Sequence, residues 1–191
     1  WSLDNFGQVL VATVKNGKTF TWNAGATTPL TVRASLATSG FETNNNPTAS
    51  RITLISPTTR HLIHLGTETT IGTASSQDEM FIRFSGSEDI NTYVPTSTNT
   101  AGTLRIQDGT KIVGALKTKE AILIWTDNAL YSMKFVGAPF IFGIEQVGTN
   151  CGLVGSTAAV EVDGVAYWMS AKGFLLYDGT VKTLPCSVED E

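Results

Sequence analysis

The sequence has few of the residues that usually carry catalysis or bind metals. Its 191 residues include two cysteines and two histidines. There is no run of about 20 apolar residues, the length that a membrane-spanning helix needs. No window of a dozen residues places apolar side chains at i, i+3, i+4 and i+7, the spacing of an amphipathic helix. Membrane-spanning and long amphipathic helices are therefore not expected.

A basic surface is also missing. Thirteen lysines and arginines are outnumbered by 17 aspartates and glutamates, so the formal net charge is −4. Proteins that hold nucleic acid by its phosphates need a basic face. The nearest basic cluster is Lys111, Lys117 and Lys119, and Glu120 interrupts it. This pattern favours the solvated edge of a strand over a phosphate-binding surface.

The sequence is instead rich in threonine and in short apolar runs separated by turn residues, which predicts an all-β fold. Asn16-Gly17 predicts a type I′ hairpin turn, and Asp163-Gly164 and Asp178-Gly179 predict further hairpins. The expected strands are 8–14, 19–22, 30–36, 51–56, 61–65, 80–85, 111–116, 121–126, 129–135, 140–146, 158–162, 165–169, 174–177 and 181–184.

A repeat organises these strands. Trp125 and Trp168 each end an apolar run, are 43 residues apart, and are followed six residues later by Tyr131 and Phe174. Trp22 and Leu65 show the same 43-residue spacing. A period of about 40 to 50 residues built from short strands is typical of β-propeller blades. We therefore expect the repeated aromatic side chains to pack between neighbouring blades rather than to stack on a ligand.

The repeat suggests one continuous domain with two parts. Residues 104–191 are expected to form two regular four-stranded antiparallel blades. Residues 1–103 are expected to form looser first blades with long polar insertions. Four blades are near the lower limit for closing a propeller. We therefore expect an incomplete β-propeller-like array that belongs to a longer chain.

The two histidines do not form a convincing metal site. His61 and His64 are three residues apart, a spacing that places them on opposite faces of a strand. The sequence favours a surface strand with one half-buried histidine.

Acidic residues in turns offer a second candidate site. Asp127, Asp163 and Asp178 are expected to bind nearby backbone N–H groups. A glycosidase would need two such carboxyl groups about 5–10 Å apart. No surrounding aromatic cluster marks a sugar platform, so the turn interpretation is favoured.

The remaining candidate residues also favour structural interpretations. Cys151 and Cys186 have no CxxC spacing, so two buried free thiols are favoured, with a disulfide between them as the alternative. The glycine-flanked loop 148–152 opens no helix and is interpreted as a link between blades. Phe135, Phe140 and Phe142 are expected to fill a core or an interface. The sequence therefore predicts no catalytic, cofactor-binding or metal-binding residue and no cofactor.

The order of several short segments resembles the tail tube or nozzle proteins of short-tailed bacteriophages, the tail tubular protein B-like family. The opening segment, WSLDNFGQ, carries part of the resemblance. The other matching segments are 81–85, 93–95, 123–127, 130–133, 136–140, 150–153, 164–169, 177–179 and 184–186. Together they span nearly the whole chain.

The resemblance implies a structural virion protein with a β-propeller-based fold. It implies a homo-oligomeric ring, a hexamer, stacked beneath the portal and a tail adaptor ring, with other tail proteins as further partners. The ring would enclose the channel for genome ejection. DNA would pass through without specific binding, which fits the acidic composition. Family members carry additional platform and tip segments, which these 191 residues are expected to lack. Localisation in the virion tail, after synthesis in the host cytoplasm, follows from the resemblance.

Two other functions remain open from the sequence. The first is a cellular β-propeller that binds a protein or a glycan through its loops. The second, less favoured, is a propeller glycosidase, which would need converging carboxylates.

Overall fold

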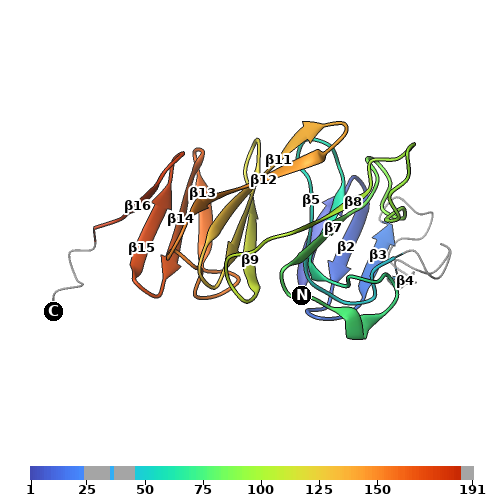
Figure 1. The fold of residues 1–191 in the computed structure, drawn as a ribbon, viewed down its shortest axis with the longest axis horizontal. Coiled ribbons are helices and arrows are strands. Elements are labelled where there is room, and N and C mark those ends of the chain that lie inside the picture. The colour runs from blue at the N-terminus through green and yellow to red at the C-terminus, as the bar shows by residue number, and fades with distance from the viewer. Residues whose placement is uncertain (24–34, 37–45, 186–191) are drawn as a thin grey trace. The chain divides into compact units, whose positions relative to one another are not determined.

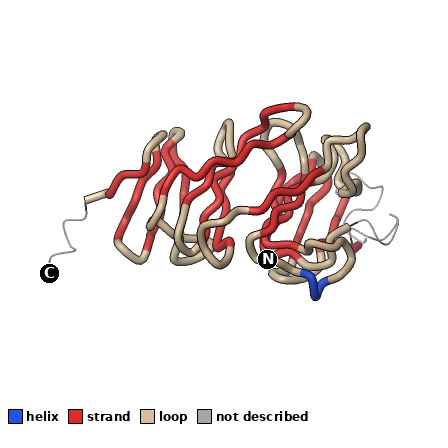
Figure 2. Tube along the Cα trace, in the orientation of Figure 1, coloured by secondary structure: helices blue, strands red, loops and turns tan. Residues whose placement is uncertain are grey.

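The computed structural model describes residues 1–23, 35–36 and 46–185. Strands and loops make up almost all of the described chain, and its one helix is a 3₁₀ turn, η1 (Ala74–Ser76) (Figure 2). The strands form four antiparallel sheets of four strands each, and each sheet is a meander like a propeller blade (Figure 1). The predicted all-β, propeller-like fold is therefore confirmed. The chain divides into two compact units, Trp1–Gln107 and Asp108–Glu191.

The first unit contains two sheets. One consists of β1 (Ser2–Phe6), β2 (Val9–Thr13), β3 (Thr19–Asn23) and β4 (Ser35–Leu36). The other consists of β5 (Ser50–Ile55), β6 (Leu62–Thr67), β7 (Phe81–Phe84) and β8 (Gly102–Arg105). The unit ends after β8, so the division falls at 107/108, whereas the sequence placed it at 103/104, inside that strand.

Polar and apolar contacts join these two sheets. Val11 packs with Ile55, Leu62 and Tyr93 in a buried cluster. Beside it, the hydroxyls of Thr13 and Thr53 are 2.7 Å apart, in a buried contact between β2 and β5. The backbone N–H of Ile55 also donates to Asp4 Oδ2 at 2.7 Å. Buried hydroxyls that bond to one another fix the register between sheets more specifically than apolar packing alone.

The second unit also contains two sheets. One consists of β9 (Ile112–Lys117), β10 (Ile122–Thr126), β11 (Leu130–Gly137) and β12 (Ile141–Gly148). The other consists of β13 (Ala159–Val162), β14 (Val165–Ser170), β15 (Gly173–Tyr177) and β16 (Val181–Thr183). The two regular C-terminal blades that the sequence predicted are these two sheets.

The core of the second unit lies between its sheets. Trp125 on β10 and Trp168 on β14 are 0% and 2% exposed, and their ring centroids are 5.5 Å apart. Leu123, Leu130, Cys151, Leu153, Ala166 and Leu175 complete the buried cluster. The expectation that both tryptophans pack between blades is confirmed.

The aromatic residues six positions after each tryptophan behave differently. Trp125 pairs with Leu130 and Trp168 pairs with Leu175, so each tryptophan shares a face with its leucine. Tyr131 and Phe174 are each next to that leucine in sequence, so they point to the opposite face. Tyr131 is buried, but Phe174 is 40% exposed. The expectation that Phe174 packs between blades is wrong.

The spacing of Trp22 and Leu65 is not a structural repeat. Trp125, Trp168 and Leu65 lie on the second strands of their sheets, but Trp22 lies on a third strand, β3. The equivalent core residue of the first sheet is Val11 on β2. The shared 43-residue interval therefore joins two positions with different roles.

Hairpin turns follow the sequence only in part. Asp163 and Gly164 both have positive φ, 52° and 84°, as a type I′ turn requires. Asn16 has φ 56°, but Gly17 is outside the positive-φ group, and five residues separate β2 from β3. The predicted type I′ turn at Asn16-Gly17 is wrong, although the hairpin is present. The reason lies in longer-range pairing, because the N–H of Asn16 donates to Ser50 O at 2.8 Å.

Candidate functional site

The two histidines lie in the interior of the first unit and not on a surface strand. His61 and His64 are 0% and 1% exposed, which corrects the sequence-based expectation. The two histidines form hydrogen bonds with different residues, as expected for side chains on opposite faces of a strand. His64 contacts the hydroxyls of Ser50, at 2.7 Å from Nδ1, and Tyr93, at 3.0 Å from Nε2. The His61 nitrogens contact the hydroxyls of Thr59 and Thr100 at 2.7 and 3.0 Å.

This environment keeps both imidazoles neutral. Burial lowers the pKa of His61 to about 4. Burial, with a smaller contribution from the nearby Arg83 charge, lowers the pKa of His64 to about 3. A buried Ser50–His64 contact resembles the first half of a catalytic triad, but both residues are fully enclosed. These contacts belong to the buried hydrogen-bond network of the first unit.

The carboxylates of Asp127 and Asp178 both accept hydrogen bonds. Asp127 accepts the backbone N–H of Thr110 at 2.8 Å and also the Thr110 hydroxyl. Asp178 accepts the ammonium of Lys182 at 2.5 Å. These bonds lower the pKa of Asp127 and, with Lys182 as the main cause, that of Asp178. The turn interpretation holds for both residues. Across residues 1–23, 35–36 and 46–185, no three histidine, cysteine or acidic side chains gather as metal ligands would.

Three further predictions concern cysteine, the basic cluster and the phenylalanines. Cys151 is a buried free thiol, and burial raises its pKa. Cys186 lies outside the described residues. Lys111 immediately precedes β9, an edge strand, and Lys117 is its last residue, as expected for the solvated edge of a strand. Phe142 is buried, whereas Phe135 and Phe140 are 46% and 76% exposed on the hairpin of β11 and β12.

The loop 148–152 is part of the link from β12 to β13 and ties the two sheets together. The N–H of Cys151 donates to Asn128 O at 2.9 Å, and the N–H of Leu153 donates to Thr126 O at 3.2 Å. The indole N–H of Trp168 donates to Cys151 O at 2.8 Å. The loop therefore connects the two blade-like sheets, as the sequence predicted.

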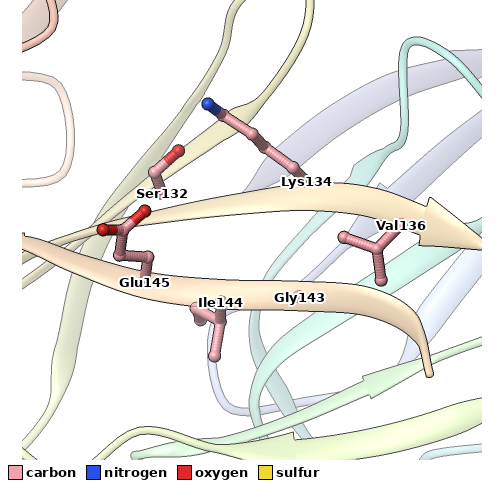
Figure 3. A pocket seen from close by; sticks show the side chains of 6 residues that line it. All are labelled: Ser132, Lys134, Val136, Gly143, Ile144 and Glu145. Carbon is pink, nitrogen blue, oxygen red and sulfur yellow. The ribbon is translucent and has the colours of Figure 1, made fainter.

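A hollow lined by both polar and apolar residues lies on β11 and β12, and sequence analysis did not identify it. Its volume is about 200 Å³. Ser132 pairs with Glu145, and Lys134 pairs with Gly143, so all four residues face the same side. Figure 3 shows the Ser132 and Glu145 side chains together on facing strands, with Val136 toward the hairpin turn.

Ser132 gives this hollow its chemical character. Ser132 is only 4% exposed, and its Oγ has no hydrogen-bond partner among the described residues. Lys134 and Glu145 flank it, and within the described chain neither forms an ion pair. A hydroxyl between opposite charges can bind a small polar group.

Comparison with known proteins does not assign the chain to a family. No family model matches the chain, and no curated protein matches it. No described helix has the length and apolar character that a membrane span requires.

Proposed function

We propose that this chain is a structural subunit of a bacteriophage tail, in the nozzle or tail-tube ring that conducts the genome during ejection. The observation that carries the proposal is the ordered series of segments, from residues 1–8 to 184–186, that resembles this family. The four blade-like sheets are the architecture that the resemblance implies. The protein would assemble with itself, with a tail adaptor and with other tail proteins in the virion.

The chemistry of the described residues is compatible with a structural role. The histidines are enclosed, and Asp127 and Asp178 bind Thr110 and Lys182. The aromatic residues Trp125 and Trp168 fill a core. The net charge of −4 favours a channel wall that repels phosphates, because each phosphate neutralised by lysine or arginine strengthens binding.

Two measurements test this proposal. Light scattering at micromolar concentration should give the mass of a closed homo-oligomer, alone or with the adaptor. Binding of double-stranded DNA should be weak at physiological salt. A protein that stays monomeric with its adaptor, or that binds DNA tightly with a steep salt dependence, would contradict the proposal.

A binding module is the second candidate, and the hollow at Ser132 favours it. A protein or glycan partner would then contact Ser132, Lys134 and Glu145. Ser132→Ala should abolish such binding while leaving oligomer mass unchanged. Glycan-array binding by a monomer would support this candidate over the ring.

A further inference from the structure

Both buried histidines of the first unit bind the same loop. This loop, residues 86–100, lies in the connection from β7 to β8. His64 lies on β6, and its Nε2 is 3.0 Å from Tyr93 Oη. His61 immediately precedes β6, and its Nε2 is 3.0 Å from Thr100 Oγ1. Two titratable rings on one short stretch of chain therefore attach the 86–100 loop to the β5–β8 sheet.

Other attachments of the 86–100 loop are exposed or apolar. Ser87 Oγ donates to Thr59 O at 2.9 Å in an exposed contact, and both side chains of the Glu88 ion pair are exposed. The Tyr93 ring packs in the buried apolar cluster of the first unit. Further hydrogen bonds, such as those that Asp89 accepts, run within the loop. The buried polar attachment of the loop therefore runs through the imidazoles.

The direction of the hydrogen bonds at His64 follows from the far end of its network. Thr67 Oγ1 donates its one hydrogen to Ala49 O at 2.8 Å, so it accepts from Ser50 Oγ, 3.1 Å away. Ser50 has then used its own hydrogen and accepts from His64 Nδ1 at 2.7 Å. A neutral imidazole with its hydrogen on Nδ1 has an acceptor at Nε2. The Tyr93 hydroxyl therefore donates to His64 Nε2.

Protonation of His64 would remove the acceptor that Tyr93 uses. Both nitrogens of an imidazolium are donors, so two hydrogens would then lie between Nε2 and the Tyr93 oxygen. Tyr93 is 1% exposed, and its hydroxyl would have to turn its hydrogen away from Nε2 within a buried site. A buried donor without an acceptor and a buried cation are both unfavourable. Release of the loop would bring water to both groups.

The charges around His64 do not compensate a proton on its ring. Its nitrogens contact hydroxyls only. Arg83 pairs with His64 on the adjacent strand β7, and burial together with the Arg83 charge lowers the pKa of His64 to about 3. Glu68 accepts from Arg83 through its backbone oxygen. Asp89 accepts hydrogen bonds from within the loop, and Asp4 on the facing strand β1 accepts a backbone N–H of β5.

We infer that His64 is a proton-operated latch: its neutral imidazole holds the 86–100 loop on β6, and its protonation releases the loop while the sheets of the first unit stay folded. The sheets persist because the backbone pairing of β5, β6 and β7 does not pass through the loop. The loop has no regular strand, so once released it has too few contacts to stay ordered. Release begins below about pH 6.5, where a free imidazole takes up a proton. The inference does not depend on the proposed tail function.

NMR tests the direction of the hydrogen bonds. Long-range ¹H–¹⁵N correlation spectra of the full chain with ¹⁵N-labelled histidine distinguish the two ring nitrogens. At pH 7, His64 should carry its hydrogen on Nδ1 and none on Nε2. A hydrogen on Nε2, with or without one on Nδ1, overturns the inference.

Hydrogen exchange between pH 7 and pH 5, corrected for the intrinsic exchange rate, tests the release. A group whose pKa is about 3 when closed and 6.5 when open favours opening about 25-fold more at pH 5 than at pH 7. Protection of the loop amides, with the Gly86 N–H that donates to Thr92 O as reporter, should fall at least about tenfold more than that of β6 and β10. An equal fall in the loop and β6, or no fall in the loop, overturns the inference.

A variant assigns the release to the imidazole. His64→Gln keeps a donor and an acceptor near Ser50 and Tyr93 but does not titrate. Its loop protection should fall at least about tenfold less than that of the wild type between pH 7 and pH 5. Equal falls in the two proteins overturn the role of His64. If the variant does not fold, the comparison of the loop with β6 in the wild type still decides the outcome.

Discussion

Trp125 and Trp168 occupy equivalent second strands of neighbouring sheets, but only one of them has its indole N–H satisfied. Their planes are inclined by 59°. Trp168 Nε1 donates to Cys151 O at 2.8 Å, whereas Trp125 Nε1 has no acceptor among the described residues. The pair therefore combines a shared packing role with different hydrogen bonding.

Removal of either ring should open a cavity between the two sheets. Trp125→Ala and Trp168→Ala are each expected to lower the free energy of unfolding by about 3–5 kcal/mol. Because the rings touch, the double variant should cost less than the sum of the two. Urea denaturation followed by circular dichroism measures both effects, and losses near zero would show that neither ring fills the core.

A smaller change tests the hydrogen bond between Trp168 and Cys151 separately from the packing of the ring. Trp168→Phe keeps a ring but leaves the Cys151 carbonyl without its donor, which should cost about 1–3 kcal/mol beyond the packing loss. Trp125→Phe is the matched control, since no acceptor loses its partner. Equal losses from the two variants would contradict this account.

Gly152 has no room for a side chain. A Cβ there would lie 2.1 Å from the backbone oxygen of Asp127, so either the link or the β10–β11 turn would have to move. Gly152→Ala should therefore destabilise the second unit by about 1–3 kcal/mol or more. Gly155, in the same link, has open space around its Cβ position, and Gly155→Ala should change stability by less than about 1 kcal/mol. Thermal melts of the two variants compare them directly.

The buried histidines make stability depend on pH. Their folded-state pKa values, about 4 for His61 and about 3 for His64, lie below the ordinary value of 6.5, so the unfolded chain binds more protons as pH falls. Stability from these groups is complete above pH 6.5 and decreases below it, by up to about 1.4 kcal/mol per pH unit for each histidine. Urea midpoints between pH 7 and 5 measure this slope.

A single substitution tests how much of the pH dependence of stability comes from His64. His64→Gln keeps polar atoms near Ser50 and Tyr93 but cannot take up a proton. Its stability should fall less steeply than that of the wild type below pH 6.5. An unchanged slope would show that His64 is not the source.

Glu68 stabilises the polar stretch after β6. It is fully buried, and its carboxylate accepts N–H groups of Thr48 at 2.9 Å, Gly72 at 2.7 Å and Thr73 at 3.2 Å. Glu68→Gln replaces one acceptor oxygen by a donor and should cost about 2–3 kcal/mol. Glu88→Gln is the control, because Glu88 and Arg60 are 60% and 44% exposed in their ion pair and the change should cost about 0–1 kcal/mol. Similar losses in chemical denaturation would contradict the role of Glu68.

The sequence predicted the second unit better than the first. Strands 122–126 and 165–170 are apolar runs bounded by turn residues, so their local signal is strong. By contrast, β1 and β8 were not predicted. Leu3 is the one large aliphatic residue of β1, and β8 follows a polar run and begins at Gly102. A Cβ at Gly102 would lie 2.5 Å from the Phe84 ring, so this strand depends on packing against β7 that local sequence does not reveal.

The candidate sites also differ in how well the sequence predicted them. Asp178 binds Lys182, four residues away, and Asp127 binds Thr110 in the connection before β9, and the sequence predicted a turn role for both. The burial of His61 and His64 depends on Thr100 and Tyr93, which are 39 and 29 residues away. The hollow at Ser132 requires the register of β11 with β12, which strand boundaries alone do not define.

Electron microscopy of the purified protein with its adaptor partner is the most direct test of the structural role. A tail-conduit subunit should appear as closed rings with a central opening wide enough for double-stranded DNA. Single particles of monomer mass at micromolar concentration, with no ring beside the adaptor, would contradict it.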